Sequence, residues 1–307
     1  MNLLEEFFVP LEEKRIAGKI LWSEKLGSLS VNNSYSFSEA GETYRTFTSL
    51  QIQSSIATIA KYQRTKESSH KTPVLLSITF NQIVDKNQDW TPNRVSVIDV
   101  DNPLKHTIDA LTNGWILKDD NLVCWIIAKR VLNQKEYSSF DLKIFDYNAR
   151  DFFEQRNKIW DKYKMEFSWR VNIPTTLKIP SFNDSYDIIS TWFKKDKNWF
   201  DKEYFKKILK PEVKVYKEYI WKEIKQQLEL NYPWFKLLKG KDLIIWLRFW
   251  IKNVEKRDLD NMFKSNIDSL TKIIYFDDKW IDTIIASKES VASKDAEFIE
   301  FTVYSKN

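Results

Sequence analysis

Residues 99–111, DVDNPLKHTIDAL, and residues 258–270, DLDNMFKSNIDSL, are two versions of one phrase in a single chain. Both follow the pattern D-x-D-N-x-x-K-x-x-x-D-x-L, and each is followed downstream by an acidic pair, at 119–120 and at 277–278. The charged and amide positions are retained, whereas most apolar positions differ. Helix caps and turns also accept Ser, Thr and Gly, so retention of these particular side chains favours chemistry over local structure.

The repeat extends over most of the chain. The first copy is expected to run from about residue 26 to 148, and the second starts at about residue 171. Apolar runs and alternation predict strands at 74–80, 94–101, 122–132 and 140–147 in the first copy, and at 242–251, 280–288 and 296–304 in the second. Helices are predicted after each D-x-D-N phrase and at 211–228. The predicted domains are therefore 1–148 and 171–307, joined by a linking helix at 149–170.

One insertion distinguishes the copies. Residues 187–209, DIISTWFKKDKNWFDKEYFKKIL, have no counterpart in the first copy. Their mixture of lysines and aromatic residues favours an amphipathic helix with the aromatic side chains packed inward, and binding of nucleic acid by this segment is the alternative.

Composition limits the possible functions. The 307 residues are 43% hydrophobic and 30% charged, which is typical of a globular chain, and that length suits two domains. Five glycines leave little material for phosphate-binding loops, and the single cysteine, Cys124, excludes a disulfide within the chain and a cysteine-based zinc site. Cys124 lies in an apolar run and is expected to be an inert thiol. A net charge of +5 permits a polyanionic partner without requiring one.

No stretch has the apolar length of a membrane span, and the N-terminal residues lack the features of a secretory signal. We therefore expect a cytoplasmic protein that does not act at a membrane.

The repeated carboxylates predict a cation site. Alternation in a strand would place Asp99 and Asp101 on one side. A strand-helix-strand crossover would bring Asp120 beside them, so we expect one such cluster in each copy. Asn102 and Asn261 are the expected helix N-caps. Converging carboxylates without histidine or cysteine suit magnesium or manganese, and a nearby lysine would complete a centre for metal-assisted phosphodiester hydrolysis. The alternative is that these residues serve only as caps, turns and exposed ion pairs.

Residues 100–120 and 257–278 resemble the signature helix and acidic turn of the RusA-like Holliday-junction resolvases, a family of magnesium-dependent endodeoxyribonucleases. The resemblance extends to SVNNSY and PSFNDSY, which begin the two copies, and to a Tyr-basic pair in the first helix of each copy (Tyr44-Arg45 and Tyr216-Lys217). It covers nearly the whole chain as two family domains in tandem. The implied fold is α+β, with a mixed β-sheet and packed helices in each domain and the two domains arranged as an intramolecular pseudo-dimer.

The resemblance also implies site residues. The family's metal-binding and catalytic aspartates fall on Asp99, Asp101, Asp120, Asp258, Asp260 and Asp278, with Asp119 and Asp277 as additional metal-binding positions, and its essential lysine falls on Lys105 and Lys264. Basic residues near these motifs are expected to contact DNA phosphates: Arg94, Lys129, Arg130, Lys256, Arg257 and Lys288. The second copy is one residue shorter between its aspartates, which could displace Asp278.

The function implied by the resemblance is Mg²⁺- or Mn²⁺-dependent cleavage of Holliday junctions or related branched DNA by paired nicks, performed by a monomer that acts as a pseudo-dimer. Further self-association stays open. The alternatives are a nuclease of the same chemistry on flaps, forks or nicked DNA in phage processing or defence, and a junction-binding protein that does not cut. An RNA-binding module is a weaker alternative, because no RNA-recognition motif is present.

Overall fold

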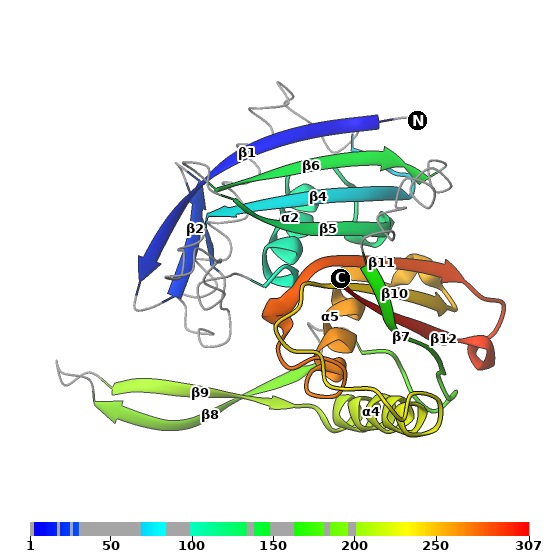
Figure 1. The fold of residues 1–307 in the computed structure, drawn as a ribbon. Coiled ribbons are helices and arrows are strands. Elements are labelled where there is room, and N and C mark those ends of the chain that lie inside the picture. Colours follow the sequence, from blue (N-terminus) through cyan, green and yellow to red (C-terminus); the bar gives the residue numbers. More distant parts are fainter. Residues whose placement is uncertain are drawn as a thin grey trace.

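The computed structural model describes residues 3–16, 19–24, 27–30, 69–83, 99–133, 138–147, 163–180, 185–195 and 201–306. Most of its strands form one continuous ten-stranded sheet (Figure 1). In the order in which they lie side by side, these strands are β3 (Gly27–Ser30), β2 (Lys19–Glu24), β1 (Leu3–Ile16), β6 (Ser138–Asp146), β4 (Val74–Ile83), β5 (Val123–Asn133), β11 (Ile281–Ser290), β10 (Leu243–Ile251), β12 (Phe298–Lys306) and β7 (Tyr163–Asn172).

The two halves of the sheet contain equivalent strands in the same order, counted outward from the centre of the sheet. On one side of the centre the order is β5-β4-β6-β1, and on the other it is β11-β10-β12-β7. In each half the strands flanking the crossover are parallel, β4 with β5 and β10 with β11, whereas β6 and β12 pair antiparallel with their neighbours. The prediction of two repeats, each with a mixed sheet in an α+β fold, is therefore confirmed.

The two halves meet where β5 pairs antiparallel with β11, and this pairing is called the seam below. Ile127 pairs with Ile285 at its centre, and each of these residues lies seven positions after the second aspartate of its acidic pair. Equivalent residues of the two copies thus pair with each other. This register is that of a local two-fold axis through the seam.

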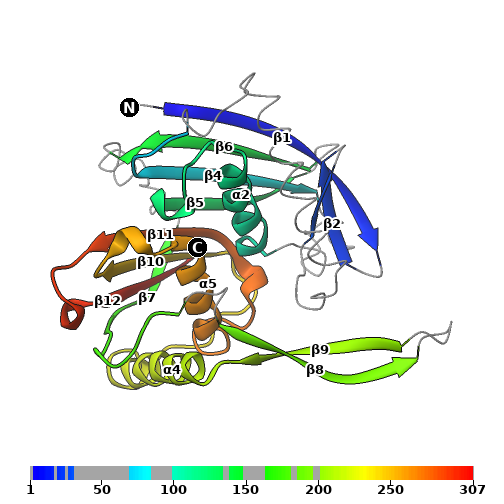
Figure 2. The same ribbon diagram turned by 180° about the vertical axis from the view of Figure 1, so that it is seen from behind.

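Helices cover one face of the sheet. Figure 2 shows α2 (Asp101–Asn113) and α5 (Leu259–Leu270) in front of the central strands, and α4 (Pro211–Asn231) lies near β7. Short 3-10 turns are η4 (Asp120–Leu122), η7 (Val254–Lys256), η8 (Asp278–Trp280) and η9 (Lys294–Ala296). No helix in the described ranges is long and apolar enough to cross a membrane.

In the second copy, the predicted helix start at 211 is confirmed for α4, whereas α5 begins three residues before its predicted start. There, α5 already begins at Leu259 with Asp258 as its N-cap, so the prediction that Asn261 caps the helix is wrong. Asn261 lies inside the first turn, and its side-chain amide donates a hydrogen bond to the Asp258 carboxylate at 3.2 Å. In the first copy, α2 begins at Asp101, so this residue belongs to a helix rather than to the predicted strand at 94–101, of which residues 94–98 lie outside the described ranges.

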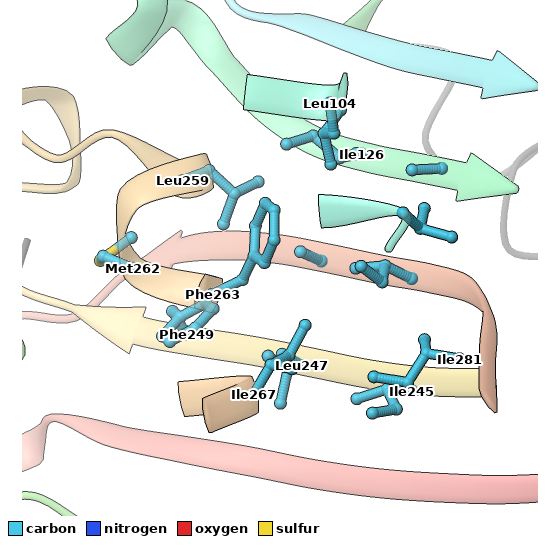
Figure 3. Packing of buried hydrophobic residues seen from close by; sticks show 14 of the residues in the cluster. Leu104, Ile126, Ile245, Leu247, Phe249, Leu259, Met262, Phe263, Ile267 and Ile281 are labelled. Carbon is cyan, nitrogen blue, oxygen red and sulfur yellow. The ribbon is translucent and has the colours of Figure 1, made fainter. Parts of the chain in front are cut away.

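One hydrophobic core serves both halves. Leu104 and Ile126 of the first half and Leu259 and Phe263 of the second belong to the same buried cluster, and Figure 3 shows them packed over the central strands. Phe263 is 1% exposed. Because the helices of both halves contribute to this core, neither half buries its apolar face alone.

Two predictions from local sequence are wrong. Residues 163–170 belong to strand β7 rather than to a linking helix, because the strand pairs with β12 and Phe167, Trp169 and Val171 pack inward at every second position. The rest of that predicted helix, up to residue 162, lies outside the described ranges.

The insertion at 187–209 is a hairpin of β8 (Tyr186–Lys195) and β9 (Asp201–Leu209), which projects from the body (Figure 1). Its β-branched and aromatic residues favour a strand over a helix.

The shared core predicts a large effect of one deletion in α5. Replacing Phe263 by alanine should lower the free energy of unfolding by about 3–5 kcal/mol, because a fully buried ring leaves a cavity between the halves. Urea denaturation followed by circular dichroism measures this loss. The matched control is Phe276→Ala, since Phe276 is 48% exposed and should cost less than about 1 kcal/mol. Equal small losses in both variants would contradict a shared core.

Candidate active site

The two acidic pairs adopt one local conformation. Asp119 and Asp277 are the N-caps of η4 and η8, with φ and ψ of −157° and 144° in the first and −156° and 137° in the second. In each, Oδ1 accepts a hydrogen bond from the backbone N–H two residues later, at 3.0 Å from Asn121 and 3.1 Å from Lys279. The shorter spacing of the second copy therefore leaves the geometry of its acidic turn unchanged.

The first acidic pair lies beside aspartates of the second half. Asp119, Asp120 and Asp258 each offer a carboxylate oxygen, and these oxygens all lie within 4.8 Å of one another. The charge of Asp260 also acts on Asp120. These four residues are called the 120/258 site.

The second acidic pair lies beside aspartates of the first half. The carboxylates of Asp99 and Asp101 both raise the pKa of Asp278, and Asp277 in turn raises the pKa of Asp99. These four residues are called the 101/278 site. Each site thus takes two aspartates from the start of one half's helix and an acidic pair from the other half.

The prediction that each copy assembles its own cluster, with Asp120 beside Asp99 and Asp101, is wrong. Helix α2 returns the chain from the carboxyl end of β4 to the amino end of β5, so Asp101 and Asp120 lie near its opposite ends. A helix of 13 residues spans about 20 Å. Because β11 runs antiparallel to β5, its acidic turn meets the end at which α2 begins. The topology therefore builds both sites from both halves.

Burial and mutual repulsion raise the carboxyl pKa values. Burial is the main cause for Asp99, whose pKa is raised to about 6, with Asp101 adding to it. The pKa of Asp120 is raised to about 7, mainly by burial and secondly by the charge of Asp258. The pKa of Asp278 is raised to about 8, mainly by burial and secondly by the charges of Asp99 and Asp101. Near neutral pH and without a cation, Asp278 is therefore mostly protonated and Asp120 about half protonated, whereas Asp99 is largely ionised.

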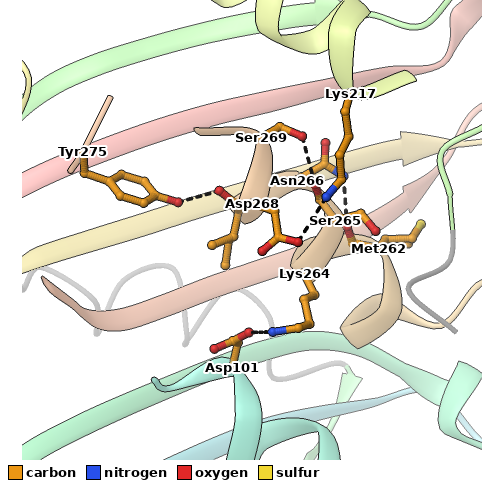
Figure 4. A network of polar contacts seen from close by, with 10 residues as sticks. Asp101, Lys217, Met262, Lys264, Ser265, Asn266, Asp268, Ser269 and Tyr275 are labelled. Carbon is orange, nitrogen blue, oxygen red and sulfur yellow. Dashed lines mark hydrogen bonds and ion pairs between the residues drawn. The ribbon is translucent and has the colours of Figure 1, made fainter. Parts of the chain in front are cut away.

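A lysine joins the 101/278 site from the second half. The Lys264 ammonium forms an ion pair with Asp101 across the gap between α5 and α2 (Figure 4). Burial alone would lower the pKa of Lys264, but the carboxylates of Asp101 and Asp268 raise it, so the ammonium stays charged. The side chain of Lys105, the equivalent residue, lies outside the described part of the structure, so its role stays a prediction.

Helix α4 supports α5 through the Tyr-basic pair. The Tyr216 hydroxyl donates to Asn266 at 2.8 Å, and the Lys217 ammonium donates to Asp268 at 3.1 Å. The second contact is drawn in Figure 4. Lys217 and Lys264 therefore lie on either side of Asp268.

The basic residues predicted to contact DNA fall into different environments. Arg130 is 3% exposed and Lys288 is 2% exposed, and this burial speaks against phosphate contacts by these two residues. Both lie on the seam strands, where neighbouring backbone and side-chain groups take up their donors. Lys129 and Lys256 are exposed, and Arg257 is half-buried, with its guanidinium 3.4 Å from the Ile179 carbonyl oxygen. Arg94 lies outside the described ranges.

Sequence reasoning missed Asp282, which pairs with Arg130 at 2.7 Å. The available signal was an aspartate at the start of a strand with an apolar centre, since a partly buried carboxylate requires a partner. It also missed the side-chain oxygen of Asn261, which is buried and makes no hydrogen bond within the described part of the chain.

Cys124 is half-buried, and burial raises the pKa of its thiol, as expected for an inert cysteine.

The donor set fits a hard divalent cation. In the 120/258 site the available ligands are carboxylate oxygens, and the orphaned Asn261 oxygen lies on the residue that hydrogen-bonds Asp258. Magnesium and manganese prefer such oxygen ligands. A bound cation would also relieve the repulsion that raises the carboxyl pKa values.

The fold and its two carboxylate clusters define a class: a two-site α+β protein whose acidic clusters suit divalent cations. The family model described as "Endodeoxyribonuclease RusA" matches residues 29–139 and 188–299, which together make up more than half of the chain. The chain therefore belongs to the RusA endodeoxyribonuclease family, with one family segment in each half. A search of curated proteins finds no match to this chain.

The raised carboxyl pKa values predict an inverted pH dependence of stability in EDTA. The unfolded aspartates lose their protons near pH 4, whereas the folded ones hold theirs until about pH 6–8, so stability should fall as pH rises through this window. The midpoint of thermal unfolding should be lower at about pH 8.5 than at about pH 5.5, and Mg²⁺ should raise it more at the higher pH.

The control for this measurement is the double change Asp120→Asn with Asp278→Asn. Asparagine mimics a protonated carboxyl and does not titrate, so the dependence on pH should flatten in this variant. A wild-type midpoint in EDTA that rises across the same window would contradict the burial of these carboxylates.

Proposed function

We propose that this protein is a magnesium-dependent, structure-selective endodeoxyribonuclease that resolves Holliday junctions or related branched DNA by paired nicks. The observation that carries the proposal is the assembly of Asp119, Asp120 and Asp258 from two halves into one oxygen cluster. Membership of the RusA endodeoxyribonuclease family supports the reaction type. Manganese is expected to substitute for magnesium, because both accept the same oxygen ligands.

The chain's own residues have distinct roles in this proposal. The aspartates of the 120/258 and 101/278 sites hold the cation, which when bound supplies Lewis acidity toward a phosphodiester and lowers the pKa of water. Lys264, which stays charged beside Asp101, binds a nonbridging oxygen of the scissile phosphate and offsets the charge that develops during cleavage. Lys105 has the same role in the 120/258 site. The exposed Lys129 and Lys256 contact the DNA backbone.

The arrangement suits a symmetric substrate. Ile127 and Ile285 are equivalent residues that pair at the seam, and this register is the one that a two-fold axis between the halves would give. A four-way junction presents two equivalent strands for cutting. A monomer with both sites can therefore make both nicks without a second chain.

A junction-binding protein that does not cut is the rival proposal. Eight aspartates gathered into two clusters would repel phosphate in such a protein, and burial already makes the ionised forms of Asp99, Asp120 and Asp278 costly. A binding role alone gives no physical reason to keep these clusters. Metal-assisted cleavage does give one.

A pair of double variants tests the composite sites. Asp101→Asn with Asp278→Asn removes two aspartates of one site, whereas Asp101→Asn with Asp120→Asn removes one from each. The first variant should still nick one strand of a labelled four-way junction in Mg²⁺. The second should lose nicking of both strands by about 10²-fold or more, since each site lacks a ligand.

The two variants carry the same charge change and are therefore matched. Junction binding in EDTA should be alike in both. The composite sites would be overturned if the variant with Asp101→Asn and Asp120→Asn still nicked one strand while the variant with Asp101→Asn and Asp278→Asn nicked neither. A wild-type protein that binds the junction but cuts neither junction, flap nor fork with Mg²⁺ or Mn²⁺ would overturn the nuclease proposal.

Lys264→Met should reduce nicking at the 101/278 site by about 10²- to 10³-fold, because the charge that stabilises the transition state is lost. Junction affinity, measured with Ca²⁺ in place of Mg²⁺, should change by less than about threefold, since one phosphate contact is a small part of the total. Strand-resolved gels report the nicks. Parallel losses of binding and cutting would mean that Lys264 acts only in DNA affinity.

A further inference from the structure

Arg130 and Lys288 occupy equivalent positions on the two seam strands. Each lies ten residues after the second aspartate of its acidic pair, and both are buried. We propose that they are positioning residues, each of which holds the acidic turn of the opposite half in its composite site. This inference rests on the proposed metal-dependent function and assigns to these two residues a role other than DNA contact.

Lys288 joins the two segments that form the 120/258 site. Its ammonium donates to the backbone carbonyl oxygen of Asn121, at 2.6 Å, and to that of Arg257. Asn121 directly follows Asp120, and Arg257 directly precedes Asp258. One buried cation thus fixes the spacing of two backbone segments from different halves, and the carboxylates that they carry move with them.

Arg130 makes the equivalent contact in the 101/278 site. Its Nη2 donates to the Lys279 carbonyl oxygen at 2.7 Å, and Lys279 directly follows Asp278. Its Nε and Nη2 also donate to Asp282 Oδ1, at 3.1 Å and 2.7 Å. The guanidinium is therefore anchored on one side and holds the acidic turn on the other.

The two arrangements differ in the basic residue, arginine in one and lysine in the other, and in whether a carboxylate lies beside it. Asp282 lies four positions after Asp278, and the residue four positions after Asp120 is Cys124, which carries no charge to match. The Lys288 ammonium instead faces the carboxylates of Asp258, Asp120 and Asp260. Its charge alone would oppose a cation in the 120/258 site, whereas its hydrogen bonds assemble that site, so the two effects on metal affinity have opposite signs.

The sign of the change in affinity therefore tests the proposal. Isothermal titration of the full chain with Mn²⁺, at about pH 8 and without DNA, should resolve two sites in the wild type. Lys288→Met should weaken one of them by about 10- to 100-fold and leave the other unchanged, as loss of an outer support typically does. Lys288→Arg should keep both sites within about threefold, because arginine fills the equivalent position.

Lys288→Gln keeps a hydrogen-bond donor at this position but removes the charge. It replaces Lys288→Met in the Mn²⁺ titration if the methionine variant does not fold. It should also weaken one site, by about 3- to 10-fold. Tighter Mn²⁺ binding in either uncharged variant would mean that Lys288 acts only through its charge, and unchanged binding would mean that it positions nothing. Absence of Mn²⁺ binding in the wild type would instead overturn the metal-dependent function itself.

A second readout separates positioning from DNA contact. In EDTA, Lys288→Met should keep junction affinity within about twofold of wild type, whereas Lys129→Met, an exposed lysine beside Arg130, should weaken it and leave Mn²⁺ binding unchanged. Weaker junction binding with a reduced salt dependence in Lys288→Met would assign Lys288 to the DNA interface and overturn the proposal.

Discussion

The antiparallel pairing of β5 with β11 is the interaction on which the rest of the structure depends. It joins two four-stranded halves into one sheet, centres them on Ile127 and Ile285, and lets the helices of both halves share a core. It also decides where the aspartates meet. Because each crossover helix carries its chain to the opposite end of its own strands, only the antiparallel neighbour can complete each cluster.

The clusters formed in this way are electrostatically unfavourable in the absence of a cation. Burial and mutual repulsion raise the pKa of Asp99, Asp120 and Asp278, and the buried cations Lys264 and Lys288 offset only part of this. Stored repulsion of this kind is what a divalent ion relieves on binding. The fold thus maintains a binding site at a cost in stability, and the seam and the shared core offset that cost.

Much of the fold could be predicted from local patterns, because short apolar runs rich in β-branched and aromatic residues, such as 74–80 and 242–251, favour buried strands. The aspartates of the candidate sites could be identified from the sequence because they occur at matching positions in both copies. Their grouping could not be predicted, since residues near in sequence, such as Asp101 and Asp120, are separated by a helix whose direction is a tertiary property. The hairpin at 187–209 was misassigned because alternating lysines and aromatic residues suit either a helix or a strand until pairing partners are known.

The composite sites have a consequence for how such a chain evolves. In a fused chain with one complete centre in each half, either half could become vestigial while the other kept a working centre. In the proposed arrangement, loss of the acidic turn of one half would disable one centre, and loss of the helix-start aspartates of that same half would disable the other. Selection for either proposed centre would preserve both copies, in agreement with the retention of every acidic position of the repeated phrase while its apolar positions drifted apart.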